Sequence, residues 1–235
     1  MFLDNHFLFH WYKGYEAKRK RLLKKAPKGA LYEFLSTPFP ALNTPVKQLD
    51  ILSVDFETTG LNAKEDKLLS VGFISMSKGQ IKLNSSYHCI IKNELLLDKD
   101  NVVIHQITDS QKNEGEKLEV VVEALLKALA GKVMLAHYSR IEIAFLRQAC
   151  IQLYGMAPVF PIIDTLAIAK RYLDNRDLPY DPSMLRLANL RAHYKLPEHR
   201  GHNALNDAIA TAELLLVQLA HQHRHNNQTL RDIIL

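Results

Sequence analysis

The sequence predicts an α/β fold in which a mixed β-sheet is flanked by helices. Strand-like segments dominate the chain just after residue 47, and helical and strand-like segments alternate in the second half. That order of elements is typical of a mixed sheet covered by helices. A run of basic residues near the N-terminus predicts an additional helical arm.

The composition fits a soluble globular chain, with 47% hydrophobic and 23% charged residues among 235. No apolar run approaches the roughly 20 residues that a membrane-spanning helix needs. The two cysteines, Cys89 and Cys150, lie outside any Cys-x-x-Cys pair, which argues against a zinc site or a disulfide framework. We therefore expect a cytoplasmic protein with reduced thiols and no membrane contact.

The basic charge is concentrated in one place. Residues 1–28 contain eight Lys or Arg and two acids, a net charge of +6, whereas the remainder carries 22 basic and 23 acidic residues. Residues 11–26 predict a basic helix that ends before Pro27. Such an arm can contact a phosphate backbone, or it can dock a partner or remain a solvated helix face. The sequence leaves these interpretations open.

Prolines divide the arm from the rest of the chain. Pro38, Pro40 and Pro45 exclude a regular helix or a central strand from this stretch. We place the boundary near residue 47. The predicted organisation is an arm and linker over residues 1–46, a main domain over 47–225 and a tail over 226–235.

The strands follow from apolar runs bounded by turns. Residues 50–56 form one such run. Residues 68–77 and 80–91 are separated by Lys78-Gly79 and predict a hairpin. Residues 132–136 predict a short buried strand, and Ile162-Ile163 the end of another.

The helices follow from apolar spacing of three and four. Residues 118–129 show this spacing and Gly131 ends it. A second helix is predicted over residues 139–154. Asp164 fits the N-cap of the next helix better than a metal ligand. Residues 183–194 and 203–221 predict the last two helices.

An acid pair ends the first predicted strand. Asp55 and Glu57 are two residues apart, so their side chains project from the same face of a strand. Adjacent carboxylates repel unless a cation lies between them, and hard oxygen ligands suit Mg²⁺ or Mn²⁺. The alternative is a solvated edge strand, which the apolar neighbours Leu52, Val54 and Phe56 disfavour.

A third carboxylate falls on an apolar stripe. Glu142 shares the inward face of its predicted helix with Phe145 and Leu146. A buried carboxylate needs a partner or a metal. The alternative is an ion pair with Arg140 or Arg147.

His202 and Asp207 form the last candidate pair. If Asn203 caps the helix, His202 precedes it on a loop and Asp207 lies one turn inside. A histidine in this position can take a proton from a metal-bound water. Taken alone, the pair also fits a surface histidine beside a solvated aspartate.

Together these segments resemble the DEDDh 3′–5′ exonuclease family, which includes the epsilon proofreading subunit of bacterial DNA polymerase III. The family motif D-x-E-T-T-G-L matches residues 55–61, and H-x-x-x-x-D matches His202 to Asp207. Residues 103–108 are similar to the family's V-H-G-I-T stretch, with Gln106 in place of glycine. The resemblance covers about residues 48–220.

The second family motif, H-N-x-x-F-D, is altered in this chain. Tyr138 stands where Asn is common, and Glu142 stands where the family has Asp. The carboxylate is kept on an arm longer by one C–C bond, about 1.5 Å. We expect retained activity and a preference for Mn²⁺.

The resemblance implies a ribonuclease H-like five-stranded sheet and a two-metal hydrolysis that releases nucleoside 5′-monophosphates. Asp55 would bridge two divalent cations, Mg²⁺ or Mn²⁺. The remaining ligands would be Glu57 and Asp207 for one ion and Glu142 for the other, with His202 as the general base. Thr58, Thr59, Leu61 and His105 would contact the terminal nucleotide, although His105 fits a packed histidine nearly as well.

Three function classes are compatible with these residues. The first is an active exonuclease, with single-stranded DNA as the expected substrate. The second is a proofreading or accessory subunit whose arm docks a DNA polymerase or another protein. The third is a nucleic-acid-binding module with weakened catalysis, which the four family residues Asp55, Glu57, His202 and Asp207 argue against.

Overall fold

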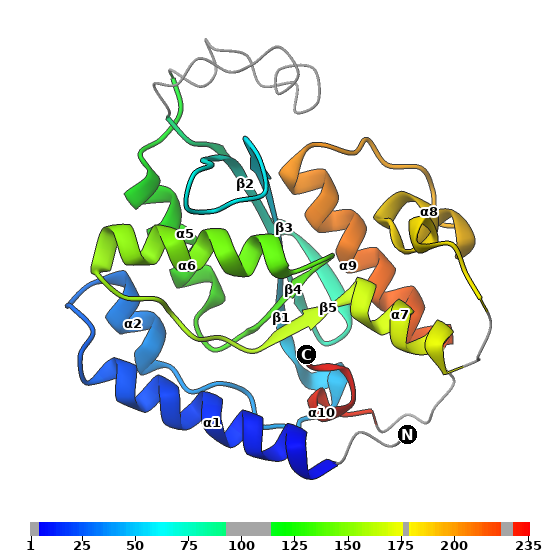
Figure 1. Cartoon of the computed structure of the whole chain (residues 1–235), viewed down its shortest axis with the longest axis horizontal. Helices are drawn as coiled ribbons and strands as arrows, with labels where there is room; N and C mark the ends of the chain where they lie inside the picture. Colours follow the sequence, from blue (N-terminus) through cyan, green and yellow to red (C-terminus); the bar gives the residue numbers. More distant parts are fainter. Residues whose placement is uncertain (1–4, 93–113, 176–178, 222–227) are drawn as a thin grey trace.

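The computed structural model describes residues 5–92, 114–175, 179–221 and 228–235, with side chains from residue 14 onward. Five strands form one mixed sheet in the order β3-β2-β1-β4-β5 (Figure 1). The strands are β1 (Asp50–Thr58), β2 (Leu68–Ser77), β3 (Gln80–Ile90), β4 (Val133–Ala136) and β5 (Ile162–Asp164). β1 pairs antiparallel with β2 and parallel with β4, and β4 pairs parallel with β5. The predicted mixed α/β sheet is confirmed.

Helices cover both faces of the sheet (Figure 1). Alternate residues of β1 enter two cores: Leu52, Val54 and Phe56 enter one, and Ile51 enters the other. The first core also receives side chains from α2 (Ala30–Ser36), α5 (Leu118–Leu129) and α6 (Arg140–Tyr154). The second receives side chains from α7 (Thr165–Asp174) and α9 (Ala204–His221). The two-residue period of the strand therefore determines which helix layer each side chain meets.

Several helix boundaries differ from the prediction. α1 spans Asn5–Leu23, so it starts earlier and ends earlier than expected. Residues 183–194 were predicted as one helix, but they form the 3-10 helix Pro182–Leu185 and α8 (Leu187–His193). The break lies at Arg186, whose ψ of 144° is incompatible with a helix. α2 and α10 (Leu230–Ile233) were not predicted, because short helices give little periodic signal.

The arm packs on the rest of the protein. Leu31, Phe34 and Leu35 of α2 are fully buried in the first core. Arg19 of α1 is also buried, at 4% exposure; its guanidinium donates to the Leu35 carbonyl and, from Nε at 2.8 Å, to Glu16. One of the arm's basic residues therefore supports the fold instead of facing solvent. The division into arm, domain and tail stays a prediction.

The last described residues lie along β5. Ile234 forms a β-bridge with Ile163, and the Leu235 amide donates to the Ile162 carbonyl at 3.0 Å. Leu230 and Ile233 are buried in the second core. This segment therefore covers the β5 side of the sheet.

β3 is the outer strand on the other side, and its pairing is irregular. Phe73 lies opposite Tyr87, but Ser75 lies opposite Lys82, so β3 carries extra residues between these pairs. Within this bulge the Ser85 hydroxyl accepts a hydrogen bond from the Ser75 amide at 2.9 Å. In the described part of the chain, no helix combines the length and apolarity needed to cross a membrane.

Candidate active site

The acid pair lies on the face of β1 that meets α9. Ser53, two residues before Asp55, donates its hydroxyl to the Ala208 carbonyl of α9 at 2.7 Å. Asp55 and Glu57 continue along the same face by the two-residue period of a strand. Asp55 is partly buried and Glu57 is buried. Two carboxylates are thus directed toward the beginning of α9.

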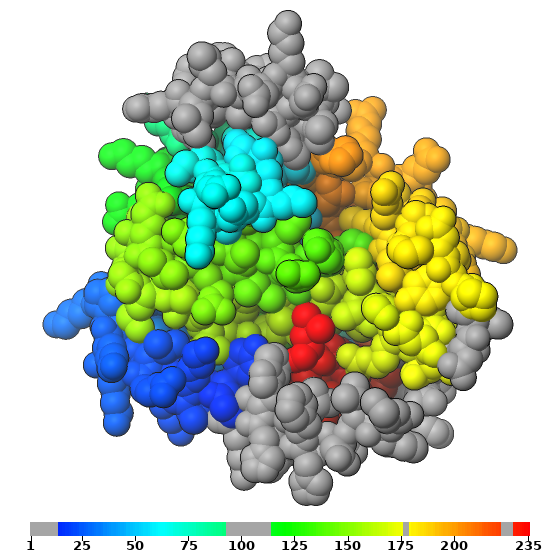
Figure 2. Space-filling model, in the orientation of Figure 1, coloured from blue at the N-terminus to red at the C-terminus, as the bar shows by residue number. Residues whose placement is uncertain are grey.

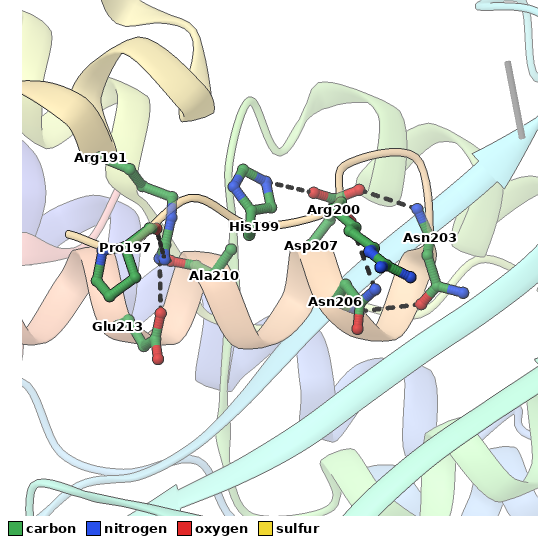
Figure 3. A network of polar contacts seen from close by, with 9 residues as sticks. All are labelled: Arg191, Pro197, His199, Arg200, Asn203, Asn206, Asp207, Ala210 and Glu213. Carbon is green, nitrogen blue, oxygen red and sulfur yellow. Dashed lines mark hydrogen bonds and ion pairs between the residues drawn. The ribbon is translucent and has the colours of Figure 1, made fainter.

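The beginning of α9 brings Asp207 to this pair. The Asn203 side chain accepts a hydrogen bond from the Asn206 amide at 3.1 Å, which caps the helix as the sequence predicted (Figure 3). Oxygens of Asp55, Glu57 and Asp207 all lie within 4.8 Å of one another. The structure therefore brings together three carboxylates from two segments about 150 residues apart in the sequence.

The Asp207 carboxylate has contacts on both oxygens (Figure 3). Oδ1 lies 2.9 Å from Nε2 of His199, and Oδ2 accepts from the Asn203 amide at 3.2 Å. Sequence reasoning missed His199, because nothing in the loop before α9 distinguishes it from its neighbours. His202 is exposed, on the loop before α9, with a positive φ of 63°. The predicted loop position of His202 is observed.

Glu142 enters the site from the first turn of α6. It is 3% exposed, on the inward stripe that the sequence predicted. Within the described residues it forms no ion pair with Arg140 or Arg147, and its Oε2 is buried without a hydrogen-bond partner. Glu142 lies outside the group of three close carboxylates, but its charge acts on Asp55.

Burial and nearby negative charges raise the pKa values of Asp55, Glu142 and Asp207. Burial, followed by the charges of Glu142, Asp207 and Glu57, raises the pKa of Asp55 well above its usual range. Burial raises the pKa of Glu142 to about 8, and the charges of Asp164 and Glu57 act in the same direction. Burial also raises the pKa of Asp207, against the opposing effect of His199. Ionising the whole cluster at neutral pH therefore costs free energy.

A divalent cation fits this donor set. Every donor is a carboxylate oxygen, the ligand type that Mg²⁺ and Mn²⁺ prefer. The unpartnered Oε2 of Glu142 is a buried atom of the kind that a cation or its water would satisfy. A cation would also neutralise the repulsion that raises these pKa values.

Asp164 connects the start of α6 to the start of α7. It caps α7 by accepting from the amides of Leu166 and Ala167 at 2.9 and 3.3 Å, as the sequence predicted. Its carboxylate also accepts from the amides of Tyr138 and Ser139 at 3.1 and 2.8 Å. Tyr138 has a positive φ of 63°, a strained conformation for a non-glycine residue. Asp164 therefore holds the turn from which Glu142 projects.

Three of the residues predicted to contact a terminal nucleotide lie at the end of β1 and on the loop that follows it. Thr58 is buried and donates its hydroxyl to the Gly60 carbonyl at 2.7 Å. The Thr59 hydroxyl donates to Asp66 at 3.1 Å, and the Asn62 amide donates to the other Asp66 oxygen at 2.8 Å. Leu61 is 76% exposed. Hydrogen bonds within the loop thus stabilise its conformation, and Leu61 faces solvent. His105 lies outside the described residues.

Comparison with known proteins adds a family match. A family model described as Exonuclease (RNase T) matches residues 52–215. The PolC-type DNA polymerase III of Thermotoga petrophila is 31% identical over 163 residues, covering 69% of this chain and 11% of that protein. The DNA polymerase III subunit epsilon of Treponema pallidum is 27% identical over 173 residues, covering 73% of this chain and 77% of that protein. The chain thus spans only about a tenth of the PolC-type relatives.

Solved structures share the fold. The nuclease domain of 3′hExo, a DEDDh family member bound to rAMP, superposes with a TM-score of 0.62 at 18% identity over 79% of this chain and 98% of that chain. Escherichia coli ExoI in a complex with single-stranded DNA gives a TM-score of 0.64 at 17% identity, over 75% of this chain and 42% of that chain. At sequence identities of 17% and 18%, these comparisons show that this chain shares the fold of the two nucleases.

Proposed function

The chain belongs to the RNase T exonuclease family, whose model matches residues 52–215, and from this membership we propose that it hydrolyses nucleic-acid phosphodiesters from the 3′ end. The observation that carries the proposal is the convergence of Asp55, Glu57 and Asp207 within 4.8 Å, with buried Glu142 beside them. Single-stranded DNA is the proposed substrate and nucleoside 5′-monophosphates are the products. The solved relative ExoI, whose complex contains single-stranded DNA, supports this choice.

The carboxylates would hold two divalent cations, Mg²⁺ or Mn²⁺. Asp55 would contribute to both ions, as the resemblance to the family implies. Glu57 and Asp207 would complete one site, and Glu142 the other. Bound ions of this kind activate a water nucleophile and stabilise the leaving oxygen.

The remaining roles fall to the loops around the carboxylates. His202 would take the proton of the attacking water, since it is an exposed imidazole at the start of the helix that carries Asp207. Thr58, Thr59 and Leu61 would contact the terminal nucleotide. His199 would orient Asp207 through the contact at 2.9 Å.

The test is the shortening of a 5′-labelled single-stranded DNA and of the RNA of the same sequence. Each reaction is run with Mg²⁺, with Mn²⁺ and with EDTA, and with Asp55→Ala as the control variant. Stepwise loss from the 3′ end that disappears with EDTA and in Asp55→Ala supports the proposal. Intact binding without shortening in either metal contradicts it and favours a binding module with weakened catalysis.

A proofreading or accessory role is the second candidate. The observation that favours it is the relationship to a subunit named DNA polymerase III epsilon, of which 77% is covered. In this role the arm would dock a DNA polymerase or another protein. Removing residues 1–28 separates the alternatives: lost turnover on free oligonucleotides favours an arm that binds substrate, and lost complex formation with unchanged turnover favours docking.

A further inference from the structure

A buried arginine joins three segments beside the candidate active site. Arg191, in the last turn of α8, is 3% exposed. Its Nη1 donates to the Ala210 carbonyl of α9 at 2.8 Å and lies 2.8 Å from a carboxylate oxygen of Glu213. Its Nη2 donates to the Pro197 carbonyl, in the loop before α9, at 2.9 Å (Figure 3). One guanidinium therefore connects α8, the loop and α9.

The packing of α8 against α9 fixes the place of this guanidinium. Leu190 of α8 and Leu214 of α9 are buried in one hydrophobic cluster. Figure 2 shows the yellow surface of the α8 segment next to the orange surface of the segment that leads into α9. The planar guanidinium directs its N–H groups rigidly, so partners bound to both Nη atoms are held in one geometry. Arg191 therefore sets where the loop runs relative to α9.

The loop that Arg191 holds carries both histidines of the candidate site. His199 follows Pro197 by two residues, and its Nε2 lies 2.9 Å from Oδ1 of Asp207 (Figure 3). His202, the proposed general base, follows three residues later. The loop is thus attached by Arg191 at Pro197 and by Asp207 at His199, and His202 comes directly after these two attachments.

The other attachment of Arg191 lies on the helix that carries the carboxylate. Ala210 follows Asp207 by three residues on α9, about 4.5 Å along the helix axis. The same guanidinium therefore relates the loop of His202 to the helix of Asp207. This relation matters for catalysis, because a general base must lie about 2.6–3.2 Å from the group it deprotonates. A misplacement of about 1 Å can cost 10²-fold in rate.

We propose that Arg191 is a positioning residue of the exonuclease reaction, which holds the loop of His199 and His202 against the helix of Asp207. The proposal rests on the proposed exonuclease function and deepens it. The alternative is that Arg191 only stabilises the packing of α8 on α9 and leaves the loop unaffected.

Arg19 is the matched control for this proposal. Of the arginines whose side chains the structure describes, Arg19 and Arg191 are the two that are buried. Arg19 likewise donates to a backbone carbonyl, that of Leu35, and to a carboxylate, that of Glu16. Its contacts lie in the arm, so the same substitution at Arg19 reports the cost of disturbing a buried arginine without touching the loop.

The first test is cleavage of the native protein by trypsin after Arg200, an exposed residue of the loop. It is done in EDTA and does not depend on turnover. Arg191→Lys keeps a cation beside Glu213 but loses the fork that also reaches Pro197, and it leaves the set of tryptic sites unchanged. We expect cleavage after Arg200 to become about tenfold faster, because the loop opens more often. Arg19→Lys should leave this rate unchanged.

The second test is a double-mutant cycle on kcat, measured on single-stranded DNA at saturating Mn²⁺. Arg191→Lys should lose about tenfold in kcat through the displaced base, and Arg19→Lys should keep the wild-type value. In the His202→Ala background, Arg191→Lys should change kcat by less than about twofold, because the loop then has no base to position. A structural role predicts the full loss in both backgrounds.

The outcomes separate this proposal from the exonuclease proposal. Absence of wild-type turnover contradicts the exonuclease function, and the trypsin test still decides whether Arg191 holds the loop. Equal cleavage rates in Arg191→Lys and Arg19→Lys, or additive losses of kcat in the cycle, overturn the positioning role.

Thermal unfolding shows whether Arg191→Lys folds. If it does not, Glu213→Gln takes its place, because this side chain is 40% exposed and contacts the same guanidinium. We expect a smaller increase in cleavage after Arg200 in Glu213→Gln. An unchanged rate in that variant would then overturn the proposal.

Discussion

Gly72 of β2 touches the backbone of Ala204 at the start of α9: a Cβ atom on Gly72 would lie 2.2 Å from the Ala204 carbonyl carbon. Gly72 also lies directly opposite Asp55 in the β1–β2 ladder. The absence of a side chain at this one position therefore allows the helix that carries Asp207 to approach the strand that carries Asp55.

Gly72→Ala should consequently separate the carboxylates. Because the colliding atoms belong to backbone, α9 must shift, and we expect a loss of about 1–3 kcal/mol in the free energy of unfolding. We also expect kcat/KM to fall at least tenfold. The control is Gly14→Ala, since a Cβ on Gly14 of α1 meets nothing within 4 Å. Denaturant unfolding measures the stability of both variants, and oligonucleotide hydrolysis measures their kcat/KM. Equal stability and equal kcat/KM in Gly72→Ala and Gly14→Ala would refute the role of Gly72.

Divalent cations should stabilise the folded protein. The ligands come from separate segments, so the unfolded chain has no preformed site, and a cation at 100 times its dissociation constant adds about 2.7 kcal/mol. We expect Mn²⁺ or Mg²⁺ to raise Tm in the wild type and not in Asp55→Asn. In EDTA, Asp55→Asn should unfold at a higher temperature than the wild type, because it removes a buried charge from a repelling cluster. A lower Tm of this variant in EDTA would contradict the repulsion inferred from the raised pKa values.

The ion-free protein should lose stability as pH rises. Glu142 has a usual pKa of 4.5 and a folded-state pKa of about 8. Between these values the folded state holds a proton that the unfolded state has released, so the free energy of unfolding falls with increasing pH. The contribution of Glu142 is fully present below pH 4.5 and is lost as pH rises through about 8. Urea unfolding in EDTA across this range measures how the free energy of unfolding changes with pH. Glu142→Gln should reduce this pH dependence. An unchanged pH dependence in the variant would mean that other groups cause it.

Asp164→Ala should affect both folding and turnover. It removes the cap of α7 and the two bonds that hold Tyr138 and Ser139 before Glu142. Loss of a cap costs about 0.5–2 kcal/mol, and the released turn should lower kcat. Asp181→Ala provides the comparison, because Asp181 caps a 3-10 helix by accepting from the Ser183 amide at 2.8 Å. Unlike Asp164, it accepts no hydrogen bond from Tyr138 or Ser139, whose amides bond Asp164. If Asp181→Ala lowered kcat equally, the connection through Tyr138 would be wrong.

Substitutions of the two histidines near Asp207 should differ in their effects on kcat and on cation affinity. As the proposed general base, His202 should give a loss of about 10²–10⁴ in kcat when changed to Ala. His199, which contacts Oδ1 of Asp207, should mainly weaken cation affinity, and His199→Gln should restore part of it through an amide donor. Turnover as a function of Mn²⁺ concentration separates the two. A larger loss of kcat at saturating Mn²⁺ in His199→Ala than in His202→Ala would exchange their assignments.

The sequence allowed the acid pair and Glu142 to be located because both follow from periodicity. The two-residue period put Asp55 and Glu57 on one face, and the helical stripe put Glu142 inward, where it is 3% exposed. The cap at Asn203 similarly followed from local chemistry. Each of these inferences needs only neighbours within one element.

Other features depend on contacts between distant segments. The bonds from Tyr138 and Ser139 to Asp164 span about 25 residues, and the contact of Gly72 with Ala204 spans more than 100. No local pattern encodes such pairs. His199 was missed for a related reason, because its contact with Asp207 depends on how the loop before α9 folds. The burial of Arg19 likewise depends on a distant contact, its hydrogen bond to Leu35 of α2.

The bulge in β3 has a consequence for self-association. An outer strand with a straight hydrogen-bonding edge can recruit a strand of another molecule, and bulges are a common protection against this. The extra residues of β3 bend its outer edge, and the Ser85 hydroxyl replaces a backbone partner of Ser75. On the opposite side Ile234 already occupies β5. The sheet therefore offers little template for intermolecular strand addition, although Leu83 is 70% exposed at the bulge.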